Sequence, residues 1–393
     1  MKNSLNIGLV GYKFMGKAHS HAYKDVSMFF DPKLKPTMKI ICGTNKNDVK
    51  EAALKYGWEN YTTKWQEIVN NPEIDIIDIS SPGNTHAPIA IAAAKAGKHI
   101  ICEKPLALSL QDSRDMLEAV KISGVKHMIG FNYRKVPAIK LAKQLIDDGK
   151  LGRIFHFRGV YLQDWIVDPN FPLVWRLQKS LAGNGAIGDL GAHIIDLARY
   201  LIGEIDEVCA LSETFIKERP LLKSTNNGLS AKAQDSLQMG TVDVDDATMF
   251  IGRFESGTLC SIESTRFATG RKNGLVFEIN GSLGSIKFDF EDMNRLQFYS
   301  SEDPQNTYGF RNILVTEPIH DYMKNWWPSG HIIGYEHTFV HEVADFLDCI
   351  YNDTLPSPNF YDGVACQEII EAVEMSAKQR RWVKLKEVKM ETV

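Results

Sequence analysis

The chain has 393 residues, of which 44% are hydrophobic and 24% are charged, and its formal net charge is -4. This is an ordinary globular composition, and the length predicts two domains, with three as the alternative. The weak negative charge and the lack of a Lys/Arg-rich run argue against a nucleic-acid partner, and no apolar run approaches a membrane span.

The cysteines are scattered through the chain and include no C-x-x-C pair. Several lie in apolar, strand-like surroundings, which predicts reduced core residues in a cytosolic protein. The apolar run after Met1-Lys2 is too short for the hydrophobic part of a signal peptide, so we expect a cytoplasmic location. The six cysteines are Cys42, Cys102, Cys209, Cys260, Cys349 and Cys366.

A dinucleotide-binding turn is predicted near the start of the chain. Residues 5–11 read as a buried strand running into glycine, and the residues after it open a helix. Gly11 and Gly16 match the first and third glycines of the G-x-G-x-x-G fingerprint, whereas Lys13 stands at the second. The alternative interpretation is a strand, turn and helix that hold no ligand.

The second predicted strand, residues 38–42, is followed by Gly43-Thr44-Asn45-Lys46. In NAD-binding folds an acidic residue near this point usually accepts the ribose hydroxyls. No acid stands here, so the residues alone leave both NAD and NADP open.

Strands and helices then alternate, which predicts a doubly wound parallel sheet. The predicted strands cover residues 74–79, 99–102 and 127–131, and the predicted helices cover 48–56, 65–69, 88–96 and 110–122. The strand at 99–102 ends on Glu103-Lys104-Pro105. Because ligands bind at the carboxyl edge of such a sheet and proline stiffens the turn, Lys104 is a candidate functional lysine; the alternative is an exposed lysine in a turn.

The remainder of the chain predicts an α+β domain. Closely spaced strands with glycine turns indicate a large, mainly antiparallel sheet, whose uncovered face could pair with another subunit. We expect a first domain at 1–131 and a second at 132–393, with a long polar loop at 215–240. The strands are expected at 154–161, 248–254, 258–265, 275–280 and 285–290, and the helices at 138–148, 189–201, 338–350 and 367–379.

Two groups of polar residues stand out in this second part. Asp189 and His193 are spaced i and i+4 on the predicted helix, so the carboxylate can orient the imidazole; the alternative is an ordinary surface pair. Gln163-Asp164-Trp165 and Trp175-Arg176 combine hydrogen-bonding groups with flat rings, as a sugar site requires, or else form a surface loop with a packed tryptophan. His337 and His341 share a helix face, but no pattern completes a metal site, and we predict none.

Several of these motifs carry a family resemblance that spans nearly the whole chain. The chain resembles the glucose–fructose oxidoreductase / inositol dehydrogenase (Gfo/Idh/MocA) family, from which it departs at Lys13 and Gly43. Within that family, residues 161–165, Trp175-Arg176 and residues 243–246 resemble the levoglucosan dehydrogenase branch. The motifs shared with the family are GLVGYKFMGKAH, Ser81-Pro82 with His86, Glu103-Lys104-Pro105, Phe131-Asn132-Tyr133-Arg134 and Gly188-Asp189-Leu190-Gly191-Ala192-His193.

The resemblance implies roles for these positions. His193 is expected to be the base, Lys104 to stabilise the alkoxide, and Asp189 to orient that pair and bind a neighbouring hydroxyl. The expected cofactor contacts are Gly11, Phe14, Met15, Gly16, Thr44, Ser81, Pro82, His86, Glu103, Lys104 and Asn132. The expected substrate contacts are Lys104, Tyr133, Arg134, Gln163, Asp164, Trp165, Trp175, Arg176, Asp189 and His193.

The implied activity is NAD-dependent oxidation of a secondary hydroxyl, C3 by expectation, of a pyranose, anhydrosugar or glycoside, with NADP open and no metal. A homo-oligomer formed through the C-terminal sheet is also expected. Three alternatives remain: a glycoside-cleaving enzyme that oxidises C3 transiently with bound NAD, an inositol dehydrogenase, and a non-catalytic sensor. A sensor should have lost Lys104 or His193, and both are present.

Overall fold

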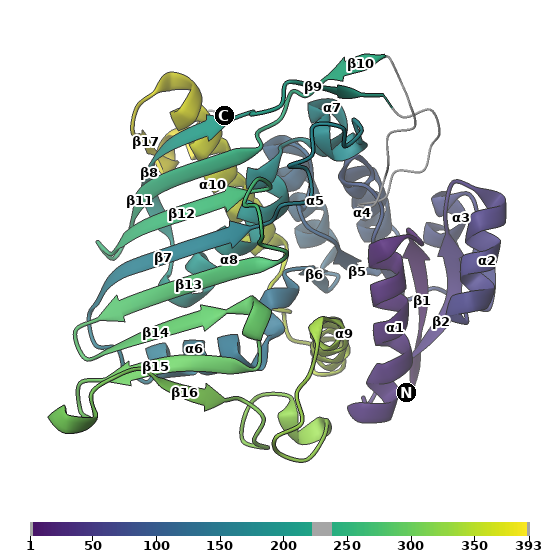
Figure 1. Ribbon diagram of the computed structural model, residues 1–393. Helices are drawn as coiled ribbons and strands as arrows, with labels where there is room; N and C mark the ends of the chain where they lie inside the picture. The colour runs from purple at the N-terminus through teal and green to yellow at the C-terminus, as the bar shows by residue number, and fades with distance from the viewer. Residues whose placement is uncertain (1–2, 222–237, 391–393) are drawn as a thin grey trace. The chain divides into compact units, whose positions relative to one another are not determined.

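The computed structural model describes residues 3–221 and 238–390 and divides into two compact units (Figure 1). The first unit contains the chain up to Val136 together with Tyr322–Ala365. The second unit contains Pro137–Asp321 and the chain from Cys366 onward. The division differs from the expected one, because the first unit runs past residue 131 and takes back a later segment.

A six-stranded sheet forms the centre of the first unit. Its strand order is β3-β2-β1-β4-β5-β6, and every neighbouring pair is parallel. This confirms the predicted doubly wound sheet, in which helices connect successive parallel strands. The strands are β1 (Ser4–Val10), β2 (Lys35–Cys42), β3 (Asn60–Thr62), β4 (Ile76–Ile79), β5 (His99–Cys102) and β6 (His127–Ile129).

The second helix of this unit begins and ends at residues whose chemistry explains its bounds. Asn45 caps the second helix with its side chain, and Gly57 ends it in the left-handed conformation at φ 81°, as expected for these residue types. The helices are α1 (Phe14–Phe29), α2 (Lys46–Tyr56), α3 (Trp65–Val69), α4 (His86–Lys95), α5 (Leu110–Ser123), α9 (Tyr335–Tyr351) and the start of α10 (Phe360–Gln379).

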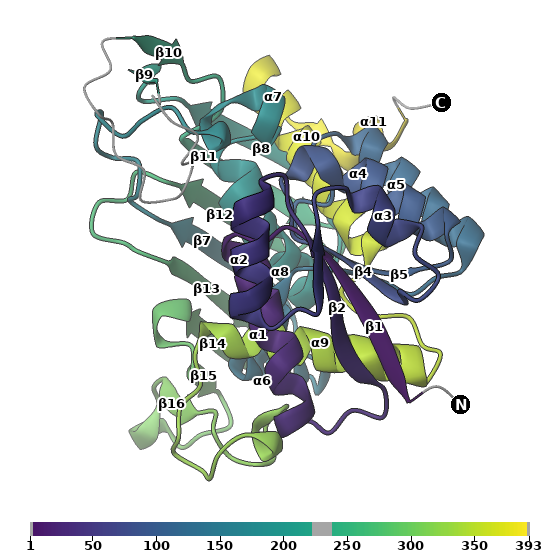
Figure 2. The ribbon, with the colours of Figure 1, turned by 90° about the vertical axis from the view of Figure 1, so that its right-hand side faces the viewer.

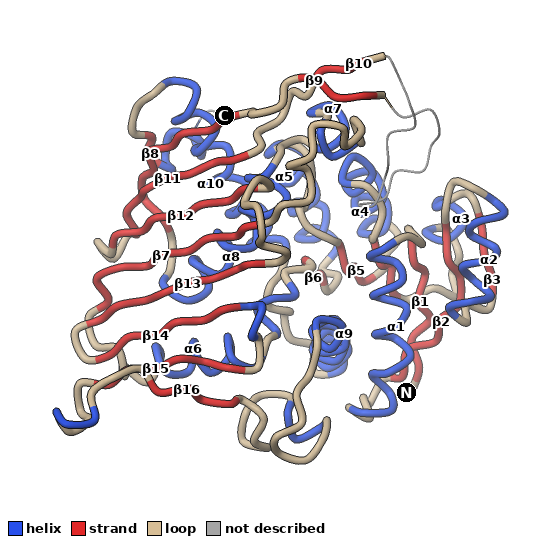
Figure 3. The backbone as a smooth tube through the Cα atoms, viewed as in Figure 1, coloured by secondary structure: helices blue, strands red, loops and turns tan. Residues whose placement is uncertain are grey.

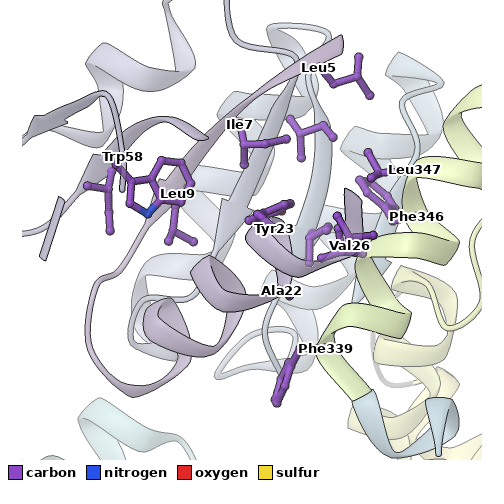
Figure 4. Packing of buried hydrophobic residues seen from close by; sticks show 14 of the residues in the cluster. Leu5, Ile7, Leu9, Ala22, Tyr23, Val26, Trp58, Phe339, Phe346 and Leu347 are labelled. Carbon is purple, nitrogen blue, oxygen red and sulfur yellow. The ribbon is translucent and has the colours of Figure 1, made fainter. Parts of the chain in front are cut away.

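Helix α9 belongs to the first unit because its apolar face completes that unit's core. Tyr23 and Val26 of α1 pack with Phe346 and Leu347 of α9 in one buried cluster (Figure 4). Removing this apolar surface from water is favourable, which explains why residues 322–365 return to the first unit although they follow most of the second in sequence.

A nine-stranded sheet dominates the second unit (Figure 3), with strand order β16-β15-β14-β13-β7-β12-β11-β8-β17. The sheet is mainly antiparallel, as expected, but its central strands β7 and β12 pair in parallel. The strands are β7 (Ile154–Leu162), β8 (Ile205–Glu213), β11 (Ala247–Phe254), β12 (Leu259–Thr265), β13 (Gly274–Gly281), β14 (Gly284–Asp289), β15 (Arg295–Ser300), β16 (Arg311–Leu314) and β17 (Val383–Lys384).

Helices cover one face of this sheet. Figures 1 and 2 show α6 (Pro137–Asp147), α8 (Ala192–Ile202) and the later part of α10 on the same side. Gly159 of β7 permits the close approach of α8, because an added Cβ there would lie 2.7 Å from Ile194. The short helices α7 (Lys179–Ala182) and α11 (Leu385–Met390) complete the unit.

Two expectations for this unit need adjustment. The helix expected at 189–201 begins as a π-helical turn, Ile187–Gly191, before continuing as α8. The loop expected at 215–240 begins and ends with paired strands, β9 (Glu218–Pro220) and β10 (Met239–Thr241), and its centre, 222–237, lies outside the described residues. None of the helices in the described ranges has the length and hydropathy needed to cross a lipid bilayer.

Candidate active site

The carboxyl ends of four strands meet at one edge of the six-stranded sheet. The last residues of β1, β2, β4 and β5 are in register with one another. Ligands bind at this edge of a doubly wound sheet, so the residues that directly follow these strands are the candidate site residues of the first unit. They are Gly11, Gly43, Ser80 and Glu103.

The turn after β1 has the shape of a dinucleotide-binding turn. Gly11 has φ +113°, and an added Cβ would lie 2.5 Å from the carbonyl oxygen of Ser80. An added Cβ at Gly16 would lie 2.1 Å from the carbonyl oxygen of Gly11, so only glycine lets α1 pack this closely on the strand. Lys13, at the second fingerprint position, is exposed and stands at the N-cap of α1, while Phe14 and Met15 open the helix.

Lys104 is the second residue after β5, and Glu103, which precedes it, is buried. Oε1 of Glu103 lies 3.0 Å from Nε2 of His19, and its Oε2 accepts the main-chain N–H of Lys104 at 3.2 Å. Nδ1 of His19 lies 2.8 Å from Oδ2 of Asp78. A fully buried Asp78–His19–Glu103 chain therefore holds the turn that carries Lys104.

In the Asp78–His19–Glu103 network, two carboxylates contact one imidazolium. Burial opposes the charged form of His19, but Asp78 and Glu103 outweigh it and hold its pKa well above that of a free imidazole. Tyr23 also donates to Asp78 at 2.8 Å. Nearby, burial and then the charge of Glu103 raise the pKa of Glu342 well above its ordinary value.

His86 connects two turns of this edge. Its Nε2 lies 2.9 Å from the carbonyl oxygen of Ser81, and its Nδ1 lies 3.0 Å from that of Pro105. Burial lowers its pKa, and the two carbonyl contacts oppose that shift. His86 was expected to contact the cofactor; the structure shows an almost fully buried ring that joins the β4 turn to the turn after Lys104.

The other residues of the first unit that are expected to contact the cofactor or the substrate differ in how exposed they are. Thr44 is exposed. The hydroxyl of Ser81, the residue before Pro82, shares a 2.6 Å hydrogen bond with the hydroxyl of Thr85. The segment after β6 is buried. In that segment Asn132 donates to Thr338 at 2.9 Å, the ring of Tyr133 lies edge-on to Tyr335, and Arg134 bonds Asp362 at 3.0 Å.

The second unit gathers its candidate residues at one edge of the nine-stranded sheet. Because β7 and β12 are parallel and end in register at Leu162 and Thr265, the residues that follow them lie side by side. These are Gln163 and Arg266. Gln163 donates its side-chain amide to Asn273 at 3.0 Å, as Tyr161 does with its hydroxyl at 2.6 Å.

Arg266 is a buried charge at this edge. It is fully buried, and its guanidinium donates to a carboxylate oxygen of Asp189 at 2.9 Å and to the carbonyl of Gly185 at 3.1 Å. The ring of Trp165 lies 5.3 Å from the guanidinium carbon. A charge-assisted bond from a rigid guanidinium fixes the direction of a carboxylate, so Arg266 holds Asp189 in place.

The segment before Asp189 is fixed by Asp245. Its carboxylate accepts the main-chain N–H groups of Gly185 and Ile187, each at 2.8 Å. Gly185 must be glycine, because an added Cβ would lie 1.9 Å from the carbonyl oxygen of Asp245. Asp245 thereby takes up main-chain donors that the π-helical turn leaves open, a turn type often found at functional sites.

The remaining candidates surround this centre. Asp164 accepts from Lys272 at 2.7 Å and from Gly270 at 3.0 Å. Arg176 lies over the ring of Trp175 at 4.4 Å, and burial lowers its pKa. His193, on α8, is 6% exposed, with its ring edge-on to Tyr161 at 5.9 Å.

Sequence reasoning missed three of these residues: Arg266, His19 and Asp78. A signal existed for the last one, because Asp78 interrupts a run of isoleucines in a strand too apolar to bury an unpaired charge. The signal for Arg266 was weaker, because it is only an arginine at a strand end. Its neighbours in space follow from the parallel pairing of β7 with β12, which the sequence does not show.

Comparison with known proteins places these features in a family. Residues 5–131 match the oxidoreductase family with an NAD-binding Rossmann fold, and residues 139–287 match the GFO/IDH/MocA C-terminal domain. The chain is 46% identical over 387 residues to levoglucosan dehydrogenase of Pseudarthrobacter phenanthrenivorans, covering 98% of this chain and 99% of the relative. The chain belongs to the Gfo/Idh/MocA family of NAD-binding oxidoreductases.

Solved structures of this family agree with the fold. An oxidoreductase domain protein from Kribbella flavida superposes with a TM-score of 0.93 at 48% identity, covering 98% of this chain and 99% of that one. A levoglucosan dehydrogenase in complex with NADH and levoglucosan superposes with a TM-score of 0.91 at 45% identity, covering 97% and 99%.

The glycine turn fits the cofactor of the Gfo/Idh/MocA family. Because Gly11 and Gly16 have no side chains, a ligand can approach the main chain at the start of α1, where helix N–H groups favour a phosphate. Gly11, Gly16 and the residues after β2 would hold NAD, which supplies the hydride acceptor when bound. Within residues 3–221 and 238–390, no group of three or more His, Cys, Asp or Glu side chains is placed to hold a metal ion.

Proposed function

We propose that this oxidoreductase oxidises a secondary hydroxyl, at C3, of a pyranose, anhydrosugar or glycoside to the keto sugar. One observation carries the proposal: an edge of the nine-stranded sheet presents the Asp189 carboxylate and the Trp165 ring beside the buried Arg266, together with the paired side-chain amides of Gln163 and Asn273. Hydroxyl-rich ligands need this mixture of acceptors, donors and flat apolar faces. The similarity to a levoglucosan dehydrogenase over 98% of the chain supports the same substrate class.

In the second unit, His193 is assigned as the base and Asp189 as its partner. His193 takes the proton of the reacting hydroxyl through its imidazole, and Asp189, held by Arg266 at 2.9 Å, orients it and accepts from a neighbouring hydroxyl. Trp165 and Trp175 offer ring faces to the C–H groups of a pyranose. Gln163 and Arg176 supply hydrogen-bond donors.

In the first unit, Lys104 is assigned the stabilisation of the alkoxide. Its ammonium group opposes the negative charge that develops on oxygen as the C–H bond breaks, which is the largest kind of catalytic contribution in such sites. The Asp78–His19–Glu103 chain fixes the main chain at Lys104 and so limits the positions the side chain can take.

The reaction is tested by following NADH absorbance with a panel of levoglucosan, simple glucosides and inositols, each with NAD and NADP. Net NADH formation with an anhydrosugar or glucoside, and a product that carries a ketone at C3, supports the proposal. Release of the aglycone without net NADH indicates transient oxidation and cleavage instead. Turnover of inositols alone indicates an inositol dehydrogenase, and cofactor binding without any turnover indicates a sensor.

Replacing His193 with alanine is expected to slow oxidation by about 100-fold to 10,000-fold, the usual contribution of a positioned base. Because the neutral imidazole accepts the proton, the wild-type rate of oxidation should rise with pH through one ionisation. A pH profile of kcat/KM should lose this limb in His193→Ala, whereas Asp189→Asn should move it and weaken sugar binding. An unchanged limb in His193→Ala would assign the ionisation to another group.

We also propose that the outer face of the nine-stranded sheet joins copies of the chain. Leu211 and Met249 are paired across β8 and β11, and with Ile251 they are 74%, 50% and 53% exposed. The alternate residues of β11 are buried, so at these three positions the outer face presents apolar side chains where solvent would favour polar ones.

A glutamate at Met249 or Ile251 is expected to lower the molar mass measured by light scattering, because it places a charge in the proposed interface. The matched control is Ile122→Glu on α5, where the side chain is 80% exposed and no interface is proposed. A wild-type chain that is already monomeric at micromolar concentration would contradict the proposal.

A further inference from the structure

The ring of Tyr12 occupies the place where an NAD-binding fold usually carries an acidic side chain. The residue after β2 is Gly43, and a Cβ added there would lie 2.1 Å from Cδ1 and 2.2 Å from Cε1 of Tyr12. Aspartate or glutamate therefore cannot occupy position 43 while Tyr12 keeps this position. The turn is fixed from the other side as well, because the N–H of Gly11 donates to Cys42 at 2.9 Å.

A carboxylate reaches the same region from the next helix. Asp48 lies in the first turn of α2, and its Oδ2 accepts the hydroxyl of Tyr12 at 3.3 Å. Partial burial and the charge of Asp48 raise the pKa of Tyr12, so the phenol stays protonated. Its O–H donates a hydrogen bond to the carboxylate. The pair thus provides a negative charge and two kinds of oxygen beside the end of β2.

The start of α2 is also closed to a phosphate. Helix N-termini bind phosphate through their first N–H groups. Here Oδ1 of Asn45 accepts the N–H groups of Asn47 and Asp48 at 3.0 and 3.3 Å. The cations nearby in sequence, Lys13 and Lys46, have exposed side chains, where charge is screened by water and salt.

We infer that Tyr12 and Asp48 replace the acidic residue that usually ends the second strand, and that the carboxylate of Asp48 selects NAD over NADP. In a dinucleotide fold the adenosine ribose is recognised at this strand end. The carboxylate and the phenol offer acceptors to ribose hydroxyls, whereas a 2′-phosphate would bring negative charge toward Asp48 without a capping N–H or a buried cation to offset it.

The roles of Tyr12 and Asp48 concern cofactor binding alone, so binding measurements test them without turnover. Dissociation constants of NADH and NADPH are measured by quenching of tryptophan fluorescence, in wild type, Asp48→Asn and the control Glu51→Gln. Glu51 is also exposed and acidic, but it lies further along α2. The wild type is expected to prefer NADH, and Asp48→Asn to reduce that preference about fivefold, the limit for an exposed charge interaction.

Salt and a coupled pair of variants sharpen the test. Because the effect is electrostatic, the preference of the wild type should fall at high ionic strength and that of Asp48→Asn should not. Gly43→Asp should weaken NADH binding through its clash with Tyr12, and Tyr12→Ala in the same chain should restore it. Equal affinity of the wild type for both cofactors, or an unchanged preference in Asp48→Asn, would overturn the inference.

Discussion

Lys104→Ala is expected to lower kcat by about 100-fold or more, the usual loss when one electrostatic partner of a transition state is removed. The side chain follows β5 at the ligand-binding edge, on a turn held by Glu103 and His19. The turn itself should survive, because Glu103 accepts the main-chain N–H of Lys104 and His19 bonds Glu103, so neither bond uses the ammonium group. NADH binding and the unfolding midpoint should therefore change little.

Two further variants separate charge from geometry. Lys104→Arg keeps the charge but not the compact ammonium group, so kcat should fall less than in Lys104→Ala. Lys95→Ala removes an exposed lysine from the last turn of α4 and should leave kcat unchanged. Steady-state kinetics on the identified sugar measure all three, and a near-normal kcat for Lys104→Ala would make the lysine structural.

His19→Gln is expected to destabilise the protein by about 3–5 kcal/mol, because removing one partner of a buried ion pair leaves uncompensated charge. Asp78 and Glu103 would both remain buried, at 0% and 5% exposure. Unfolding in urea, followed by tryptophan fluorescence, measures the loss. The exposed His331, whose ring contacts the carbonyl of Pro328, provides the control variant His331→Gln, with little expected change.

The loss should depend on pH in one direction. The folded-state pKa of His19 lies well above its unfolded value of about 6.5. Its contribution to stability is therefore complete below that unfolded value and disappears as the pH rises through the folded-state pKa. The difference between wild type and His19→Gln should be largest near pH 6 and shrink in alkali; a difference that grows with pH would show that His19 is neutral in the folded protein.

The periodic parts of this fold were predictable from sequence. Buried strands such as residues 99–102, and glycines such as Gly11 and Gly57, leave local signals that do not depend on distant partners. The position of α9 was not predictable in this way: its apolar stripe indicates that it is buried, but not which unit buries it. The parallel pairing of β7 with β12 is hidden for the same reason, since neighbouring strands in sequence usually pair as hairpins.

The candidate site shows the same division. Lys104, Asp189 and His193 belong to short motifs that can be recognised in the sequence. In the structure Lys104 follows strand β5, and Asp189 and His193 lie in the helical segment that begins at Ile187. Their supporting residues come from far along the chain: Arg266 bonds Asp189 across 77 positions, and His19 bonds Glu103 across 84. Such pairs follow from three-dimensional register, which no local pattern encodes.

The return of residues 322–365 to the first unit has a consequence for synthesis on the ribosome. The N-terminal sheet can form early, but the apolar surface of α1 that packs on Phe346 and Leu347 waits until the ribosome has translated almost the entire second unit. Nascent chains of intermediate length therefore carry an uncovered apolar stripe, the kind of surface that chaperones bind and that leads to aggregation. A gene fragment that stops after the sixth parallel strand encodes all six strands of that sheet without the helix that closes the core.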